Sequence, residues 1–224
     1  FYLILGLRYE HTQTKGNSIT TGIFNENEFN NVFPSLTLTY DPSDKHSFSV
    51  GYSKRIDRPG FSDINPFRTY SDFFFFSEGN PLLTPSITHN IDFSYIFNND
   101  LEISVYHTIL KDAVDFITLT TADTNAVVSR PENFYDQSTF GLDIYYNFNP
   151  TSWFNSNNGF SAYYNSSESN IPSVTLANLS GSGFYLSTRN TFTLNKEKGN
   201  AVYLNFFQNF PETNGFLKTF NVAN

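Results

Sequence analysis

The sequence of 224 residues contains no cysteine, no methionine and only one tryptophan, and charged residues make up 15% of it. Without cysteine the chain has no disulfide framework, thiol nucleophile, zinc–thiolate site or iron–sulfur cluster. Its net charge of −8 argues against a nucleic-acid partner, which requires clustered lysine and arginine. No apolar run approaches the ~18 residues of a membrane-spanning helix. Residues 1–7 lack the basic leader of a signal peptide, and the missing methionine predicts a processed N-terminus or an internal piece of a longer protein.

Aromatic residues, by contrast, are abundant. They form 18% of the sequence, with 26 phenylalanines and 14 tyrosines. The mean hydropathy is nevertheless only −0.35. Few charges, many aromatic rings and many small polar groups together predict a protein that meets two environments, one apolar and one aqueous. Disorder is not expected, because a chain of this composition can bury apolar surface.

The apolar residues recur with a period of two. In segment 1–12, leucine and aromatic side chains occupy the odd positions, whereas Gly6, Arg8 and Glu10 occupy even ones. The alternation recurs in 35–40, 47–53, 87–97, 101–109, 139–148 and 184–194, and less cleanly in 153–165 and 201–210. A strand places alternate side chains on opposite faces, so the sequence predicts about nine β-strands, each with one apolar and one polar face. The charged residues expected on the polar face are Arg8, Glu10, Asp92, Glu102, Asp143 and Arg189.

The connections between these segments alternate in length. Short connections are expected at 41–45, 98–100, 149–151 and 195–199, and long ones at 13–31, 58–86, 121–137 and 166–179. Tight turns at one end and long extracellular loops at the other are typical of outer-membrane barrels. A soluble β-rich binding module is the alternative, because the core of a β-sandwich alternates in the same way. The loop asymmetry and the low charge of the polar faces favour the barrel.

The fold class we predict is all-β: a transmembrane antiparallel up-and-down β-barrel of which this chain holds a part. Bacterial single-chain barrels have an even number of strands, and a sheet with two open edges invites aggregation. We therefore expect residues 1–224 to be a segment of one larger barrel domain, integral to the outer membrane of a Gram-negative bacterium and in contact with its lipid. The basic and imidazole side chains expected on the apolar face all fall toward the long-loop end of their strands: His11, Lys54, His89, His107 and Lys111.

Two short motifs lie in the long connection 58–86. They are Asn65-Pro66-Phe67 and, further on, Glu78-Gly79-Asn80-Pro81 followed by Leu83 and Pro85. Together with the opening strand 6–12 (GLRYEHT), they resemble the barrels of TonB-dependent outer-membrane receptors, in the outer-membrane β-barrel family. That family's pattern continues Lys-Pro-Glu, where this chain has Thr84-Pro85-Ser86. The Asn-Pro pairs form turns and Gly79 allows a positive φ, so we expect a structural loop.

The resemblance implies a receptor of about 22 strands with a plug in its lumen. Such a receptor imports a scarce nutrient (an iron chelate, cobalamin, a glycan or a peptide) with energy delivered through TonB. The implied partners are the plug domain and remaining strands of the same parent chain, TonB through an N-terminal region absent here, and, as a further candidate, a surface lipoprotein. The alternatives are a passive porin and a structural barrel of a larger outer-membrane assembly, neither of which has a plug and TonB box.

No residue pattern predicts enzyme chemistry. The four histidines share no ligand spacing, and the carboxylate pairs Asp112/Asp115 and Glu26/Glu28 are interpreted as lumen or rim groups, with a weak cation site as the most that Glu26 and Glu28 could support. We therefore assign no catalytic, metal-binding or cofactor-binding residue.

The run Phe73, Phe74, Phe75 and Phe76 lies in the same connection as the two motifs. Such a run would be a liability if it were exposed to water. We expect it to pack the loop onto its neighbours, with contact to the lipid interface or a ligand vestibule as alternatives.

Overall fold

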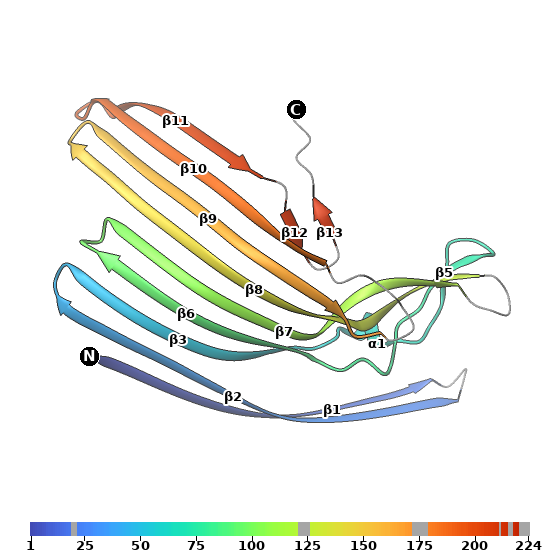
Figure 1. Cartoon of the computed structure of the whole chain (residues 1–224). Coiled ribbons are helices and arrows are strands. Elements are labelled where there is room, and N and C mark those ends of the chain that lie inside the picture. The colour runs from blue at the N-terminus through green and yellow to red at the C-terminus, as the bar shows by residue number, and fades with distance from the viewer. Residues whose placement is uncertain (19–21, 121–125, 172–178, 211, 215–216, 220–224) are drawn as a thin grey trace.

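The structure is a computed structural model that describes residues 1–18, 22–120, 126–171, 179–210, 212–214 and 217–219. Nine long strands form one antiparallel meander in which each strand pairs with its predecessor (Figure 1). In order they are β1 (Tyr2–Ser18), β2 (Ile23–Ser43), β3 (His46–Asp57), β6 (Ser86–Phe97), β7 (Leu101–Thr120), β8 (Val127–Thr151), β9 (Phe154–Ser169), β10 (Leu179–Asn195) and β11 (Asn200–Asn209). This confirms the predicted all-β up-and-down architecture and the nine strands of the meander.

The shorter elements lie outside the meander. The connection from β3 to β6 contains the helix α1 (Phe61–Ile64) and the strands β4 (Thr69–Tyr70) and β5 (Phe75–Ser77). A separate hairpin consists of β12 (Glu212–Asn214) and β13 (Leu217–Thr219). Among the described residues, no helix is long and apolar enough to cross a membrane.

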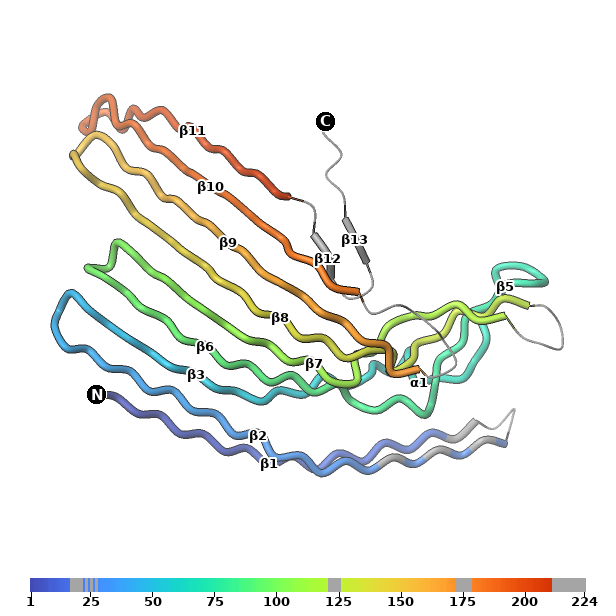
Figure 2. Tube along the Cα trace, in the orientation of Figure 1, coloured from blue at the N-terminus to red at the C-terminus, as the bar shows by residue number. Residues whose placement is uncertain are grey.

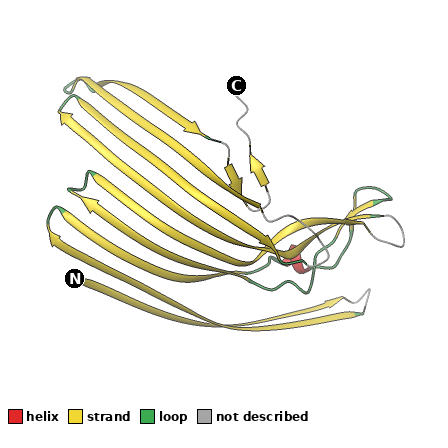
Figure 3. Ribbon diagram, in the orientation of Figure 1, coloured by secondary structure: helices red, strands yellow, loops and turns green. Residues whose placement is uncertain are grey.

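Turns and loops segregate to opposite ends of the sheet. The turns at 44–45, 98–100, 152–153 and 196–199 share one end, which we call the short-turn end. The connection with α1, β4 and β5 lies at the other, the long-loop end (Figure 3). This confirms the predicted asymmetry for the connection 58–86, whereas the tips of the other predicted long connections, at 19–21, 121–125 and 172–178, lie outside the described residues.

Three of the predicted long connections are wrong in extent, because strand continues into them: 13–31, 121–137 and, as far as Ser169, 166–179. The pairing of β1 with β2 runs on from Thr12↔Phe29 to Ser18↔Ile23, and β8 already begins at Val127. Figure 2 shows β1 and β2 running side by side as one long hairpin along the edge of the sheet. The ladder is made by backbone hydrogen bonds, which need no apolar side chains. Polar segments therefore extend these strands although the hydrophobic alternation has ended.

The strand register gathers polar residues into continuous rows on one face. One row runs Ser35, Ser53, Asn90, Thr108, Thr139, Asn165, and the next but one runs Thr39, Ser49, Ser94, Ser104, Asp143, Ser161. Between them, tyrosine rings lie over glycines: Tyr106 covers Gly141 and Tyr163 covers Gly183. A Cβ on Gly141 would come within 2.1 Å of the Tyr106 ring. These glycines leave room for the large side chains of the polar face.

The opposite face is apolar in the same continuous way. A central row runs Leu38, Val50, Phe93, Val105, Leu142, Ala162, Phe184. Toward the short-turn end, aromatic rings touch across strands, as in Phe48–Tyr95 with centroids 4.8 Å apart and Phe154–Phe192 at 5.0 Å. Leu7 on this face is 77% exposed and Phe93 is 44% exposed. Large apolar side chains thus face outward from the sheet, as a surface in contact with lipid requires.

Candidate functional site

The two sequence motifs lie in one folded loop at the long-loop end. This loop, residues 58–85, leaves β3 and returns into β6. We call it the signature loop. Its strand β5 joins the main sheet by pairing in parallel with the start of β8, with Phe75 opposite Val127 and Ser77 opposite Ser129. The signature loop is thus attached to the main sheet through β5.

The phenylalanine run is divided by this pairing. Phe76 is 4% exposed and packs with Ala126 and Val128, whereas Phe73 is 96% exposed and Phe74 is 67% exposed. The carboxylate of Asp72 fixes the turn by accepting hydrogen bonds from the backbone N–H groups of Phe74 and Phe75, both at 2.7 Å. The run therefore presents two rings to solvent on a well-held turn and buries a third.

Arg68 holds the other side of this hairpin. Its guanidinium lies 4.4 Å from the ring centroid of Phe76, and its Nε donates to Glu78 at 2.9 Å. Hydrogen bonds with Tyr70 and Glu78 raise the pKa of Arg68 above its ordinary value. The motif residue Glu78 thus serves as the anionic partner of an arginine stacked on the buried ring.

Asn80 connects the signature loop to β8 and is 7% exposed. Its side-chain N–H groups donate to the carbonyl of Pro131 at 3.2 Å and to the Glu132 carboxylate at 2.8 Å. Its side-chain oxygen accepts from the backbone N–H of Leu82 at 2.9 Å, which forms the turn through Pro81. Buried amides require such partners, and Asn80 uses both its donor and its acceptor group.

Gly79 lies where two backbone segments touch. Its N–H donates to the carbonyl of Asn65 at 2.9 Å, and the next residue, Asn80, donates to the carbonyl of Asp63 at 2.6 Å. A Cβ on Gly79 would meet the Asn65 carbonyl oxygen at 2.4 Å. The expectation that Gly79 supplies a positive φ is wrong, since the glycines with positive φ among the described residues are Gly22 and Gly199. Gly79 is required by close approach of the two motifs.

The end of the signature loop lies against a β-bulge in β7. Leu83 is 2% exposed and Ser86 is 6% exposed. Asn133 of β8 pairs with Thr84 as a strand would, accepting from its N–H and donating to its carbonyl, both at 2.9 Å. Asn133 and the Ser86 hydroxyl also donate to the carbonyl of Asp112, whose φ of +53° belongs to the bulge.

The remaining motif residues complete the same structure. Asn65 accepts a hydrogen bond from the N–H of Phe67, Phe67 is 54% exposed, and Pro66 lies between them. Pro85 is buried beside the bulge segment. The structure therefore brings both motifs together in one loop, in which Phe73 and Phe74 stay exposed.

Lys111, in the bulge segment of β7, forms an ion pair with Asp136 of β8. Lys111 and Asp136 are 2.5 Å apart, and Asn170 also donates to Asp136. Burial alone would raise the pKa of Asp136, but the hydrogen bonds from Lys111, Asn170 and the backbone N–H of Asp112 hold it below its ordinary value of 3.8. The same contact with Asp136 raises the pKa of Lys111.

We expect acid to loosen the bulge. Because the folded pKa of Asp136 lies below the unfolded value, its stabilising contribution is present at neutral pH, weakens as pH falls past about 3.8 and is lost through the folded pKa. Exchange protection of the Asp112 amide, which donates to Asp136 at 2.9 Å, should fall in that window. Asp136→Asn should abolish the pH dependence and Asp115→Asn should keep it. An unchanged profile in Asp136→Asn would contradict this.

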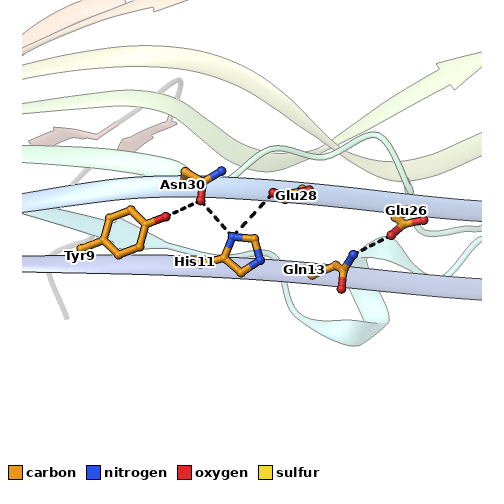
Figure 4. A network of polar contacts seen from close by, with 6 residues as sticks. All are labelled: Tyr9, His11, Gln13, Glu26, Glu28 and Asn30. Carbon is orange, nitrogen blue, oxygen red and sulfur yellow. Dashed lines mark hydrogen bonds and ion pairs between the residues drawn. The ribbon is translucent and has the colours of Figure 1, made fainter.

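A ladder of polar side chains joins β1 and β2 (Figure 4). Tyr9 and His11 of β1 both contact the side-chain oxygen of Asn30 on β2, at 2.7 and 2.9 Å. Gln13 donates to Glu26 at 2.7 Å, and His11 lies 3.7 Å from Glu28. Glu26 is also paired with Lys15. Glu26 therefore bonds across the hairpin and Glu28 lies beside His11. No group of three potential metal ligands occurs among the described residues.

Among the basic and imidazole residues expected on the apolar face, His89 and His107 have hydroxyl partners on neighbouring strands. The Tyr52 hydroxyl lies 3.0 Å from His89, and His107 lies 2.8 Å from the hydroxyl of Ser138. At the short-turn end of the polar face, an open hollow of 480 Å³ is lined by Glu102, Tyr145, Tyr185 and Arg189 among others. Sequence alternation placed Glu102 and Arg189 on one face but could not bring them to one hollow, which depends on the register of four strands.

The outer membrane protein beta-barrel family matches residues 1–224. Among solved structures, the ferric enterobactin receptor PfeA in complex with BCV-L6 superposes with a TM-score of 0.53 at 14% identity, covering 87% of this chain and 36% of that one. The siderophore receptor PirA from Pseudomonas aeruginosa gives 0.53 at 12% identity, covering 84% and 44%. These likenesses show the fold, and no curated protein matches the chain.

Proposed function

Because the chain belongs to the outer membrane protein beta-barrel family, we propose that it forms part of the barrel wall of a TonB-dependent receptor that imports a scarce nutrient. The family makes it an integral protein of the outer membrane, which excludes the soluble binding module. The chain spans 36% and 44% of the two receptors to which it is similar. The plug, the remaining strands and the contact with TonB are part of the same proposal and concern the parent protein.

Two features together carry the proposal: the meander with its apolar and polar faces, and the signature loop fixed at its long-loop end. The meander has an apolar outer face and a polar face with continuous rows of hydroxyl, amide and carboxylate groups, which suits a wet lumen holding a plug. At the long-loop end, the signature loop is fixed by β5 and by Asn80. The barrel thus presents a preformed outer surface, on which the exposed rings of Phe73 and Phe74 are candidate first contacts for a ligand or a surface lipoprotein.

Planar-bilayer conductance of the native protein separates a receptor from a passive porin. The polypeptide would be extracted with detergent from the outer membrane and its intact mass measured. We expect a mass several times 25.6 kDa and little steady conductance, which rises when mild denaturant displaces the plug. A mass near 25.6 kDa, or an open channel without denaturant, would contradict the receptor and favour the porin.

A further inference from the structure

Three cations lie near one buried aromatic ring and one carboxylate in a chain that is acidic as a whole. Arg8 of β1 and Lys54 of β3 lie at the ring of Phe33 of β2, and Arg58, which follows β3, is joined to Arg8 through the carboxylate of Glu10. We call these three cations the basic cluster. Its net charge with Glu10 included is +2, whereas the whole chain carries −8. The overall acidity of the sequence, which argues against capture of strongly anionic ligands, does not describe this part of the surface.

The cluster is built around a buried ring. Phe33 is 4% exposed, the Arg8 guanidinium carbon lies 4.8 Å from its ring centroid, and the Lys54 ammonium lies 6.0 Å from it. Stacking on an aromatic face orients a guanidinium without neutralising it. The side chain of Arg8 is nevertheless 62% exposed and that of Arg58 is 34% exposed. The cations are thus positioned by the protein and still reachable from water.

Glu10 shows what chemistry this arrangement accepts. Its Oε1 lies 2.9 Å from Nε of Arg8, and its Oε2 accepts a hydrogen bond from Arg58. One carboxylate is therefore held by two guanidiniums, the donor geometry that suits carboxylates and phosphates. Within the described residues, Lys54 has no carboxylate at ion-pair distance, so the cluster keeps capacity for a second anion.

The position suits a ligand entering from outside. Arg8 and Glu10 share a face of β1 with Gly6, and Gly6 is covered by the Ser35 hydroxyl of the polar row. They lie at the height of Tyr9, where the outer face changes from apolar residues to the polar ladder. The cluster therefore lies on the prospective lumen side, near the outer mouth of the barrel.

We propose that Arg8, Lys54 and Arg58 form a subsite that takes a carboxylate or phosphate group of the incoming ligand, with Glu10 as its internal occupant. The inference rests on the receptor function proposed above and adds the chemical class of the ligand: a nutrient or chelate that carries an anionic group. Glu10 would yield its two guanidiniums when the ligand's anion arrives.

The test uses the full-length native protein in detergent, with citrate and inorganic pyrophosphate as probes and calorimetry as the readout. We expect wild type to bind at least one probe, and Arg8→Gln/Arg58→Gln to bind it about tenfold or more weakly, since hydrogen bonds to charged groups are lost. Glu10→Gln should bind about tenfold more tightly, because the competing carboxylate is gone. Lys45→Gln, which removes one charge at the opposite end of β3, is the matched control and should match wild type.

The results distinguish a failure of the proposed subsite from a failure of the proposed receptor function. Folding of every variant is checked by the change in gel mobility between unheated and heated samples. Absence of binding by wild type, or equal affinity in wild type and Arg8→Gln/Arg58→Gln, would overturn the subsite even if the barrel is closed and large. An open channel whose citrate binding still depends on Arg8 and Arg58 would overturn the receptor and keep the subsite.

Discussion

Replacing Val105 with lysine is expected to cost the barrel about 2–4 kcal/mol of its free energy of unfolding in lipid. Val105 lies in the middle of the apolar row, opposite Phe93 on β6 and Leu142 on β8. An ammonium at this depth must leave water or pull its strand toward the interface. The measurement is the urea midpoint of the full-length protein folded into phospholipid vesicles, with unchanged slope.

The neighbouring residue supplies the control. Ser104 lies on the polar face, opposite Ser94 and Asp143. Lysine at this position meets water and a carboxylate, so Ser104→Lys should shift the midpoint far less than Val105→Lys. Equal losses in the two variants would mean that both faces meet the same environment, and the assignment of lipid and lumen sides would fail.

The faces of this sheet could be predicted because they depend on local sequence. A period of two fixes which residues share a side, and the register then joins those sides into rows without further choice. The same rule explains why the β1–β2 hairpin was predicted too short. Beyond Tyr9 the alternation gives way to the ladder of His11, Gln13 and Glu26, in which polar side chains bond across the strands. A hydrophobic pattern does not predict strand pairing that is supported by polar side chains.

The attachments of the signature loop could not be predicted in the same way. Asn80 reaches the carbonyl of Pro131, 51 residues away, and β5 adds to β8 in parallel, against the antiparallel order of the rest of the sheet. Turn chemistry at Asn80-Pro81 is local and was readable. The partner that buries the asparagine is set by the path of a strand that follows much later, and a single sequence carries no signal for it.

The basic cluster depends on the same kind of information. Arg8 and Glu10 were predicted to share the polar face, since they are two residues apart. Lys54 was expected on the apolar face, yet its ammonium lies at the ring of Phe33, whose other cationic neighbour is Arg8. A long lysine side chain can carry its charge away from the face where its stem begins. Residue alternation therefore predicts the face on which a side chain begins, but not where the charged end of a long side chain lies.

Gly79→Ala tests whether the signature loop is held by the contact between its two motifs. The added methyl would lie 2.4 Å from the carbonyl oxygen and 2.7 Å from the amide nitrogen of Asn65, and 2.7 Å from the carbonyl oxygen of Asp63. All three are backbone atoms, so the clash cannot be relieved by turning a side chain. Overpacking of this kind costs about 1–3 kcal/mol. We expect the loop to open more often while the strands of the meander remain paired.

Trypsin acting on intact cells measures this opening, because the bond after Arg68 lies inside the loop and Arg68 is held by Glu78 and Phe76. Cleavage there should be about tenfold faster or more in Gly79→Ala, since such proteolysis follows the population of the open loop. Gly60→Ala is the matched control in the same loop, because its methyl would have side-chain atoms as its nearest neighbours, the closest being the carboxylate of Asp63 at 3.2 Å. Equal cleavage of the two variants would show that the contact at Gly79 does not hold the loop. Faster cleavage in Gly79→Ala alone, with the heat-dependent gel mobility of the barrel unchanged, would show that one backbone contact fixes the outer surface independently of the wall beneath it.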